Sequence, residues 1–291
     1  MGSPWRTTPG QLPRISIVTP SLNQADYLED TLSSVVAQGY PNLEYVVVDG
    51  GSTDDSVGII KRHEKAISLW ISEPDKGHAD ALNKGFARTT GEIMGWLNSS
   101  DVYYPWTLET VADVFHDLPE VEWIEGVQSY VDVGPRPKSV AAGFCNRYDL
   151  LADLHPKIQQ ESVFWRRSLW ERAGGGLDDT LRLACDYALW VEFSRYAPLY
   201  HVGTILAAFR YHEDRRGHLL REDYACEARR IRDAELALLS KSERARVALL
   251  SCVLRSGGRR ASTLLARARL LHGYRYARVT YDFSQRKWRV V

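Results

Sequence analysis

The sequence predicts an α/β protein with a mainly parallel, Rossmann-like sheet flanked by helices and a helix-rich basic C-terminal extension. Apolar runs rich in β-branched residues alternate with stretches of helical periodicity through residues 15–97. This alternation is typical of βαβ units, whose strands run parallel. Polar segments follow several of the apolar runs, and parallel sheets bind ligands at the carboxyl ends of their strands. These observations predict a binding site along one edge of the sheet.

Each predicted element rests on its local pattern. The first strand is the run ISIVT, which ends at Pro20, and the first helix carries apolar pairs at Tyr27, Thr31 and Val35 with Asn23 at its N-cap. The predicted strands cover residues 15–19, 43–48, 68–71 and 92–97. The predicted helices cover residues 24–38, residues 53 or 54 to 64, and residues 79–87.

Beyond residue 119 the alternation weakens. We expect a hairpin over residues 121–133, a loop-rich stretch at 136–153, a helix at 181–196 and strand structure at 199–211. From residue 221 the pattern is helix-rich and basic. The predicted organisation is a loose leader at 1–13, a catalytic domain at 14–219 and an extension at 220–291.

Composition and charge exclude several classes of protein. The 291 residues are 44% hydrophobic and 25% charged, which argues against a disordered chain. No apolar run approaches the roughly 18–20 residues of a membrane-spanning helix. The N-terminus lacks the apolar core of a signal peptide. The four cysteines show no CxxC spacing, so a zinc site is not expected. We expect a reduced, cytoplasmic setting.

The zero net charge hides an asymmetry along the chain. Residues 221–291 contain 17 Lys and Arg against 7 Asp and Glu, a net charge of +10, so residues 1–220 carry −10. Basic residues there interleave with apolar clusters, including residues 264–271. One interpretation is a basic amphipathic helix at the inner face of a membrane. The alternative is a helix that packs on the acidic body or forms a homodimer. No nucleic-acid-binding module is recognised.

Three polar segments fall at predicted strand ends. They are residues 19–23, 49–54 and 98–101. The chain has no GxGxxG, GxxxxGK[ST] or GxSxG motif, so the common phosphate loops and the hydrolase elbow are absent. Aspartates at strand ends instead suggest a nucleotide held partly through Mg²⁺ or Mn²⁺, which prefer oxygen ligands.

A series of motifs resembles the family 2 glycosyltransferases of GT-A fold. The motifs occur in the family's order from residue 14 to 212: SIVTPSLNQ (16–24), VVDGGSTD (47–54), SEPDKG (72–77), DALNKG (80–85), GWLNSSD (95–101), QQESVF (159–164), CDYALW (185–190) and FRYH (209–212). Any one of these motifs is weak evidence, whereas the ordered series is specific. The resemblance implies a nucleotide-sugar half at 14–101 and an acceptor half at 102–219.

The resemblance also implies roles for particular residues. Asp49 would contact the base or ribose, and Asp101 would bind the metal with His212. Ser100 stands where the family usually has an acid, and its hydroxyl can still hydrogen-bond ribose. The residues expected around the nucleotide-sugar are Thr19, Pro20, Ser21, Asn23, Asp49, Asp75, Lys76, Asn83, Asn98 and Ser100. Lys76 and Asn83 are equally compatible with helix capping.

Asp186 matches the family's catalytic base. An aspartate at the start of a helix is favoured in its ionised form by the helix dipole, and inverting glycosyl transfer needs a carboxylate that deprotonates the acceptor. Trp96, Trp165 and Trp190 are expected in the core or as an acceptor platform.

The resulting hypothesis is a metal-assisted, inverting hexosyltransferase of polysaccharide or glycoconjugate biosynthesis. It would use a nucleotide-sugar, with a UDP-sugar favoured over GDP- and dTDP-sugars, and a glycan, lipid-linked or small-molecule acceptor. One alternative is a non-catalytic nucleotide- or glycan-binding member, because Ser100 replaces an acid. A second is a nucleotidyltransferase, which would release pyrophosphate.

Overall fold

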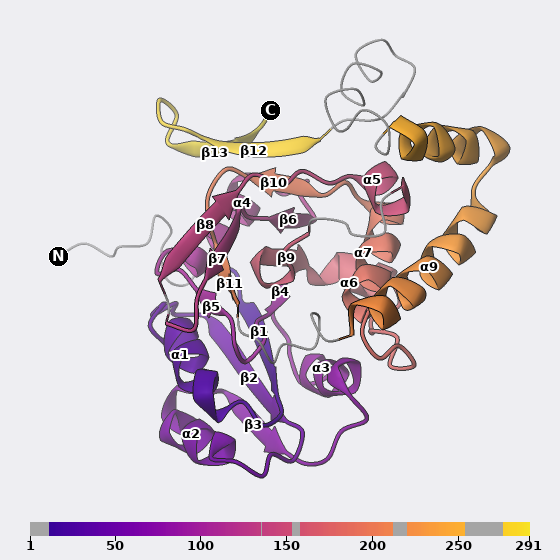
Figure 1. The fold of residues 1–291 in the computed structure, drawn as a ribbon. Coiled ribbons are helices and arrows are strands. Elements are labelled where there is room, and N and C mark those ends of the chain that lie inside the picture. The colour runs from indigo at the N-terminus through magenta and orange to yellow at the C-terminus, as the bar shows by residue number, and fades with distance from the viewer. Residues whose placement is uncertain (1–11, 135, 153–157, 212–219, 254–275) are drawn as a thin grey trace.

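A nine-stranded sheet runs through the centre of the structure (Figure 1). The computed structural model describes residues 12–134, 136–152, 158–211, 220–253 and 276–291. The strand order is β13-β12-β10-β6-β9-β4-β1-β2-β3. The strands are β1 (Ile15–Ser21), β2 (Leu43–Asp49), β3 (Leu69–Ser72), β4 (Ile93–Trp96), β6 (Trp123–Glu125), β9 (Val163–Arg166), β10 (Tyr200–Val202), β12 (Ala277–Asp282) and β13 (Lys287–Val290).

The sheet is parallel through its first half. Strands β3, β2, β1 and β4 are parallel neighbours, whereas β9 runs antiparallel between β4 and β6. Ser21 pairs with Asp49 in the register, and Asp49 pairs with Ser72. The carboxyl ends of three strands therefore lie side by side, as the sequence predicts.

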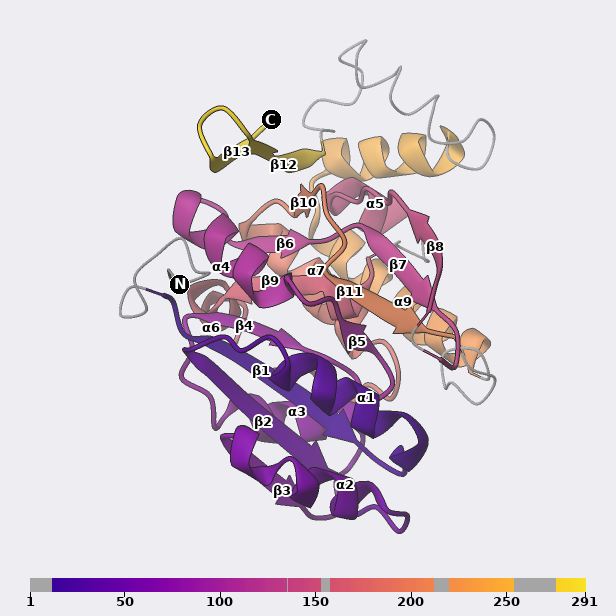
Figure 2. The ribbon, with the colours of Figure 1, turned by 90° about the vertical axis from the view of Figure 1, so that its left-hand side faces the viewer.

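Helices cover both faces of the sheet (Figures 1 and 2). Ile15 and Ile17 of β1 pack in one core with α1 and α2, whereas Val18 packs in the other core with α3. Side chains alternate between faces along a strand, so one short apolar run serves both cores. The helices are α1 (Ala25–Val36), α2 (Ser56–Arg62), α3 (His78–Phe86), α4 (Thr107–Asp117), α5 (Arg147–Ala152), α6 (Arg167–Arg172), α7 (Cys185–Tyr196) and α9 (Arg221–Leu238), with 3₁₀ turns at Glu64–Ala66 and Gln160–Ser162.

A four-stranded sheet lies beside the main sheet. Its order is β5-β11-β7-β8, with β5 (Val102–Tyr103), β7 (Gln128–Val131), β8 (Pro137–Ala141) and β11 (Ala207–Arg210). The expected hairpin over residues 121–133 is wrong, because β6 joins the main sheet and β7 the smaller one. The hairpin is instead β7–β8, and with α5 it occupies the stretch expected to be loop-rich. The strand expected at 199–211 is likewise divided, into β10 and β11.

The expected N-cap of the first helix is also wrong. Helix α1 begins at Ala25 with Gln24 at the N-cap position, and Asn23 has a positive φ of 53°. The Asn23 side chain instead accepts a hydrogen bond from the backbone N–H of Thr53, at 2.8 Å. Asn23 therefore joins the loops that follow β1 and β2.

The C-terminal region contains helices at residues 221–238 and 241–253 and a β-hairpin at residues 277–290. Strand β12 pairs in parallel with β10, and β13 pairs antiparallel with β12, so the helix-rich extension also adds two strands to the main sheet. Within the described part of the chain, no helix is long and apolar enough to span a membrane. Residues 264–271, the apolar and basic clusters behind the membrane interpretation, lie outside the described residues.

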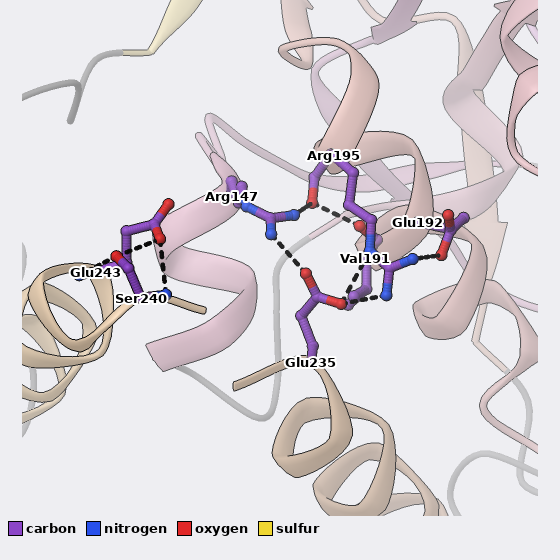
Figure 3. A network of polar contacts seen from close by, with 8 residues as sticks. Arg147, Val191, Glu192, Arg195, Glu235, Ser240 and Glu243 are labelled. Carbon is purple, nitrogen blue, oxygen red and sulfur yellow. Dashed lines mark hydrogen bonds and ion pairs between the residues drawn. The ribbon is translucent and has the colours of Figure 1, made fainter. Parts of the chain in front are cut away.

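Helix α9 is joined to the body of the protein through a nearly buried carboxylate (Figure 3). Glu235 is 3% exposed and pairs with Arg147 of α5 and Arg195 of α7. Ala228 and Val247 of the C-terminal region are buried in the same hydrophobic cluster as residues of α7. These contacts support the alternative in which the C-terminal region packs on the body. The charges are opposite to those expected, because the C-terminal region supplies the acid and the body supplies the bases.

We expect Glu235→Ala to lower the free energy of unfolding by about 2–4 kcal/mol. The change removes the nearly buried acid that pairs with Arg147 and one of the two acids that pair with Arg195, which keeps Glu192. Chemical denaturation of both proteins measures the difference. Asp233→Ala is the matched control, because this carboxylate is 62% exposed and pairs with the adjacent Arg232, so its loss should change stability by less than about 0.5 kcal/mol. Equal stability of the two variants would contradict the assigned role of Glu235.

Candidate active site

A cleft with a volume of about 700 Å³ lies where the strand ends meet the start of α7. Its lining comes from both halves of the described chain. Seven of the residues predicted from sequence line it: Pro20, Ser21, Asp75, Asn98, Ser100, Asp101 and Asp186. Other lining residues include Gln128, Tyr130, Gln160, Glu161, Arg182, Phe209 and Tyr224. Of the three polar segments that one crevice could gather, the first and third contribute to the lining, whereas no residue of 49–54 does.

The wall formed by β1 and the loop after β3 offers polar atoms to a ligand. The Ser21 hydroxyl is buried and has no hydrogen-bond partner among the described residues. Asp75 lies across from it and accepts a hydrogen bond from the backbone of Gly77, at 2.9 Å. A Cβ at Gly50 would lie 2.3 Å from the Asp75 carboxylate, so this close approach requires glycine.

The loop at residues 98–101 is fixed around Asp101. Asp101 is 1% exposed, and its Oδ1 accepts the backbone N–H of Arg210 at 2.9 Å. Burial raises the pKa of this carboxyl to about 7, although the Arg210 and Asn98 hydrogen bonds oppose the shift. The Asn98 Oδ1 is buried without a partner among the described residues, so it too is available to a ligand.

Glu161 brings a second carboxyl close to Asp101. It is 2% exposed, and its Oε1 has no hydrogen-bond partner in the described part of the chain. Burial, followed by the neighbouring Asp101 carboxylate, raises the pKa of Glu161 well above its usual range. Two like charges in a buried site favour a bound cation over two free carboxylates.

The donor set fits a divalent cation that shares its coordination with a phosphate. Four carboxyl groups line the described cleft, from Asp75, Asp101, Glu161 and Asp186, against one guanidinium, from Arg182. A diphosphate bound here needs additional positive charge. Among the described residues, no group of three or more His, Cys, Asp and Glu side chains is placed to hold a metal ion by itself. His212 lies outside the described residues.

Asp186 lies in the first turn of α7 and is half-buried. Its Oδ1 accepts the backbone N–H of Tyr187 at 2.7 Å and the phenol of Tyr224 at 3.4 Å. Burial raises the pKa of Asp186 to about 6, and these two hydrogen bonds oppose that increase. The carboxyl is therefore largely ionised at neutral pH and close enough to neutrality to accept a proton.

Five other predicted residues lie outside the cleft lining. Asp49 is fully buried and accepts hydrogen bonds from the backbone of Gly51 and Ser52 and from the Ser72 hydroxyl. Thr19 contacts the Tyr45 hydroxyl at 3.0 Å. Both side chains already have partners within the fold.

The other three make local or cross-segment contacts. Asn83 joins α3 to the backbone of Leu177 through both ends of its amide. The Lys76 backbone N–H donates to Asp80, and Asn23 contacts Thr53 as described above. The Asn83 contact joins two distant segments and is not the helix cap that the sequence left open, and α3 has no side-chain cap hydrogen bond.

The three tryptophans expected in the core or at the acceptor are all buried. Trp96 stacks on Trp190 with ring centroids 5.6 Å apart, and Trp165 meets both edge-on. Trp96 also lines the cleft, and these rings form the rigid floor beneath it.

Glu161 and Tyr224 are site residues that sequence reasoning did not select. Glu161 belongs to the recognised QQESVF motif, so its position after a polar pair and before a strand was an available signal. Tyr224 lies on α9, beyond the region of resemblance, and no local pattern distinguishes it. Its proximity to Asp186 depends on tertiary packing.

The chain is similar in sequence to known glycosyltransferases. The model of the family described as glycosyl transferase family 2 matches residues 16–173. An uncharacterised glycosyltransferase of Rickettsia prowazekii is 28% identical over 211 residues, covering 69% of this chain and 64% of its own length. One of Mycobacterium tuberculosis is 42% identical over 90 residues, covering 31% of this chain and 34% of its own length. The chain thus spans less than two thirds of either relative.

Solved structures share the fold. TarS from S. aureus (residues 1–349, in complex with UDP-GlcNAc) has a TM-score of 0.67 at 16% identity, covering 84% of this chain and 73% of that one. The mannosyltransferase PcManGT from Pyrobaculum calidifontis, in complex with GDP-Man and Mn²⁺, has a TM-score of 0.58 at 22% identity, covering 94% and 85%. These likenesses confirm the predicted GT-A-like fold. The family model matches residues 16–173, more than half of the chain, so the chain belongs to glycosyl transferase family 2.

Proposed function

We propose that this protein transfers a sugar from a nucleotide-sugar to an acceptor hydroxyl with inversion at the anomeric carbon. The observation that carries the proposal is the placing of Asp101 and Asp186 on the walls of one cleft. One carboxyl lies in the loop after β4, and the other lies at the start of α7. A single cleft can therefore hold both the leaving diphosphate and the attacking hydroxyl.

A UDP-sugar is the donor we favour. TarS is solved with UDP-GlcNAc and with UDP, which supports a uridine nucleotide for a chain of this fold. PcManGT is solved with GDP-Man, so GDP-sugars remain alternatives together with dTDP-sugars. The polar atoms proposed to face the donor are those of Ser21, Asp75, Asn98 and Ser100. Thr19 and Asp49 would act by shaping the loops beside it.

Asp186 is the proposed general base. The acceptor hydroxyl gives its proton to the carboxylate while its oxygen attacks the anomeric carbon. The bond from this carbon to the diphosphate oxygen breaks, and the electron pair leaves with the nucleoside diphosphate. Because attack and departure occur on opposite faces, the product has inverted configuration.

Asp101 and Glu161 are the residues proposed to hold a divalent cation, Mn²⁺ or Mg²⁺. The unpartnered Glu161 Oε1 and the excess of carboxyl groups in the cleft support this assignment. PcManGT is solved with Mn²⁺. When bound, such an ion stabilises negative charge on the leaving diphosphate. Ser100, which replaces the usual acid, is proposed to contact ribose through its hydroxyl.

The acceptor half is proposed to take a glycan, a lipid-linked sugar or a small molecule. A non-catalytic nucleotide- or glycan-binding protein is the alternative function, and Ser100 is the observation that favours it. Release of nucleoside diphosphate from the donor separates the two functions. A nucleotidyltransferase would instead release pyrophosphate.

Asp186→Asn should lose transfer by about 10²- to 10⁴-fold and bind donor nearly as the wild type does. The amide preserves the shape of the side chain but cannot accept the acceptor proton, and this range is usual for a positioned base. Nucleoside diphosphate release from a panel of UDP-, GDP- and dTDP-sugars measures turnover, and a thermal shift measures binding. Near wild-type transfer by Asp186→Asn would contradict the assignment, and binding without release by the wild type would favour the alternative.

The pH dependence of transfer should have an acidic limb near pH 6. Burial raises the pKa of Asp186 to about 6, so the base is protonated below that pH and kcat/KM should fall about tenfold per unit. Measurement at saturating Mn²⁺ keeps protonation of Asp101 from contributing to the same limb. A flat profile from pH 4.5 to 8 would contradict a base with this pKa.

Asp101→Ala should weaken Mn²⁺-dependent donor binding by at least about 10-fold. Loss of a residue that only hydrogen-bonds to a metal ligand already costs about this much, and a direct ligand should cost no less. Ser100→Asp should tighten or preserve metal binding, because it adds a carboxylate beside Asp101. Calorimetric titration of UDP with Mn²⁺, with and without chelator, measures both effects. Asp55→Ala is the control, since its carboxylate is 69% exposed on α2. Binding that ignores both chelator and Asp101→Ala would overturn the metal site.

A further inference from the structure

Helix α9 lies along α7 with one stripe of inward side chains. Tyr224, Ala228, Ile231 and Glu235 follow the spacing of four, three and four residues that places side chains on one helix face. Ala228 is fully buried, and Tyr224 and Ile231 pack against the same core cluster. At the far end, Glu235 pairs with Arg195, in the last turn of α7 (Figure 3). The position of α9 relative to α7 is thus fixed along its length.

At the near end, Tyr224 reaches the proposed base. Its Oη lies 3.4 Å from Oδ1 of Asp186. Burial raises the pKa of the Tyr224 phenol well above its usual range, so the hydroxyl keeps its proton and donates to the carboxylate. Tyr187 and Tyr224 both donate to Oδ1, and the backbone of Asp186 itself also hydrogen-bonds the carboxylate. Donors from α7 and α9 together therefore orient the carboxylate.

One turn along α9, Glu227 holds the backbone that leads into α7. Its carboxylate accepts the N–H groups of three successive residues, Arg182, Leu183 and Ala184, at 2.9–3.0 Å. Ala184 is the N-cap position of α7, two residues before Asp186. Charge-assisted hydrogen bonds of this kind are stronger than neutral ones, so Glu227 fixes the start of the helix.

We propose that Tyr224 and Glu227 of α9 are positioning residues for Asp186: Tyr224 orients the carboxylate and Glu227 anchors the turn that carries it. The proposal rests on the proposed function for the role of Asp186 as base. It places part of the catalytic support outside residues 16–173, the region that matches the family.

The titratable groups near Asp186 come from α9, from α7 and from the turn before α7. Tyr224 and Glu227 belong to α9, and Cys185 belongs to α7; Arg182, in the preceding turn, lines the same cleft. Burial raises the pKa of the Cys185 thiol above its usual range, so it stays neutral. Loss of the Tyr224 hydroxyl removes a donor to the charged form of Asp186, which raises the pKa of that carboxyl further.

Tyr224→Phe removes one hydroxyl and keeps the ring that packs in the core. We expect kcat to fall about 3- to 10-fold, with the KM for donor unchanged and the acidic limb of the pH profile moved up by roughly half a unit to one unit. UDP-GlcNAc and GDP-mannose serve as donors. Tyr196→Phe is the matched control, because Tyr196 is 45% exposed at the other end of α7. A Tyr224→Phe profile that coincides with the wild type would overturn the proposal for Tyr224.

A second measurement needs no substrate. Melting temperatures are compared for wild type, Tyr224→Phe, Asp186→Asn and the double variant at pH 8 and pH 4.5. Because Asp186 is ionised at the higher pH, we expect a coupling of about 2 °C there and a smaller one at pH 4.5. Equal coupling at both pH values, or none, would overturn the contact even if the protein transfers no sugar.

Glu227 is tested against Glu235, a carboxylate on the same face of the same helix. Glu227→Gln should lower kcat while it changes the melting temperature little, because its main effect is to weaken the hydrogen bonds that anchor the turn before Asp186. Glu235→Gln should lower the melting temperature with kcat preserved at a temperature where both variants are folded. If the two variants lose stability and kcat in the same proportion, Glu227 is merely structural and the proposal fails for it. If the wild type transfers no sugar but the melting temperatures show the expected coupling between Tyr224 and Asp186, the result counts against the proposed function instead.

Discussion

The position of the loop at residues 98–101, which lines the cleft, depends on one fully buried guanidinium, that of Arg210. Its Nε donates to the carbonyl of Ser100 at 2.7 Å, and another nitrogen pairs with Asp30 at 2.9 Å. A third nitrogen donates to the carbonyl of Val133, and the backbone N–H of Arg210 holds Asp101. A buried cation is stable only when its donors are satisfied, so α1, the smaller sheet and the loop at 98–101 must keep their mutual positions. The cleft between them is thereby preformed.

Residues 15–97 are predictable from sequence because their structure is local in origin. Runs such as residues 15–19 and 43–48 are β-branched, end at polar turns and alternate with amphipathic helices, so each βαβ unit follows from its own pattern. After residue 119, neighbouring strands belong to different sheets: β6 pairs with β9 and β10, whereas β7 pairs with β8 and β11. Three-residue strands carry too little periodicity to show which sheet they join.

The site divides in the same way. Ser21, Asn98 and Asp101 follow predicted strands, so their meeting at one edge follows from the parallel order. Asp49 also ends a strand, but its carboxylate is satisfied by its own loop, and such internal hydrogen bonding cannot be read from a motif. Glu161 and Tyr224 reach the cleft from a 3₁₀ turn and a distant helix. Their contribution depends on packing between segments more than sixty residues from the strand ends.

The charge of the C-terminal region is a poor guide to how it binds the body. Residues 221–291 carry a net +10, yet two acids of α9, Glu227 and Glu235, make its charged contacts with the body, beside the apolar packing of its inward face. The reason is that the groups to be satisfied on the body are donors: the backbone N–H groups before α7 and the guanidiniums of Arg147 and Arg195. Arginines 229 and 230 of α9 are exposed. Helix α9 itself contains four Arg against five Asp and Glu, so the net charge of the whole region does not describe it. Two of its carboxylates, those of Glu227 and Glu235, contact the body and the turn before Asp186.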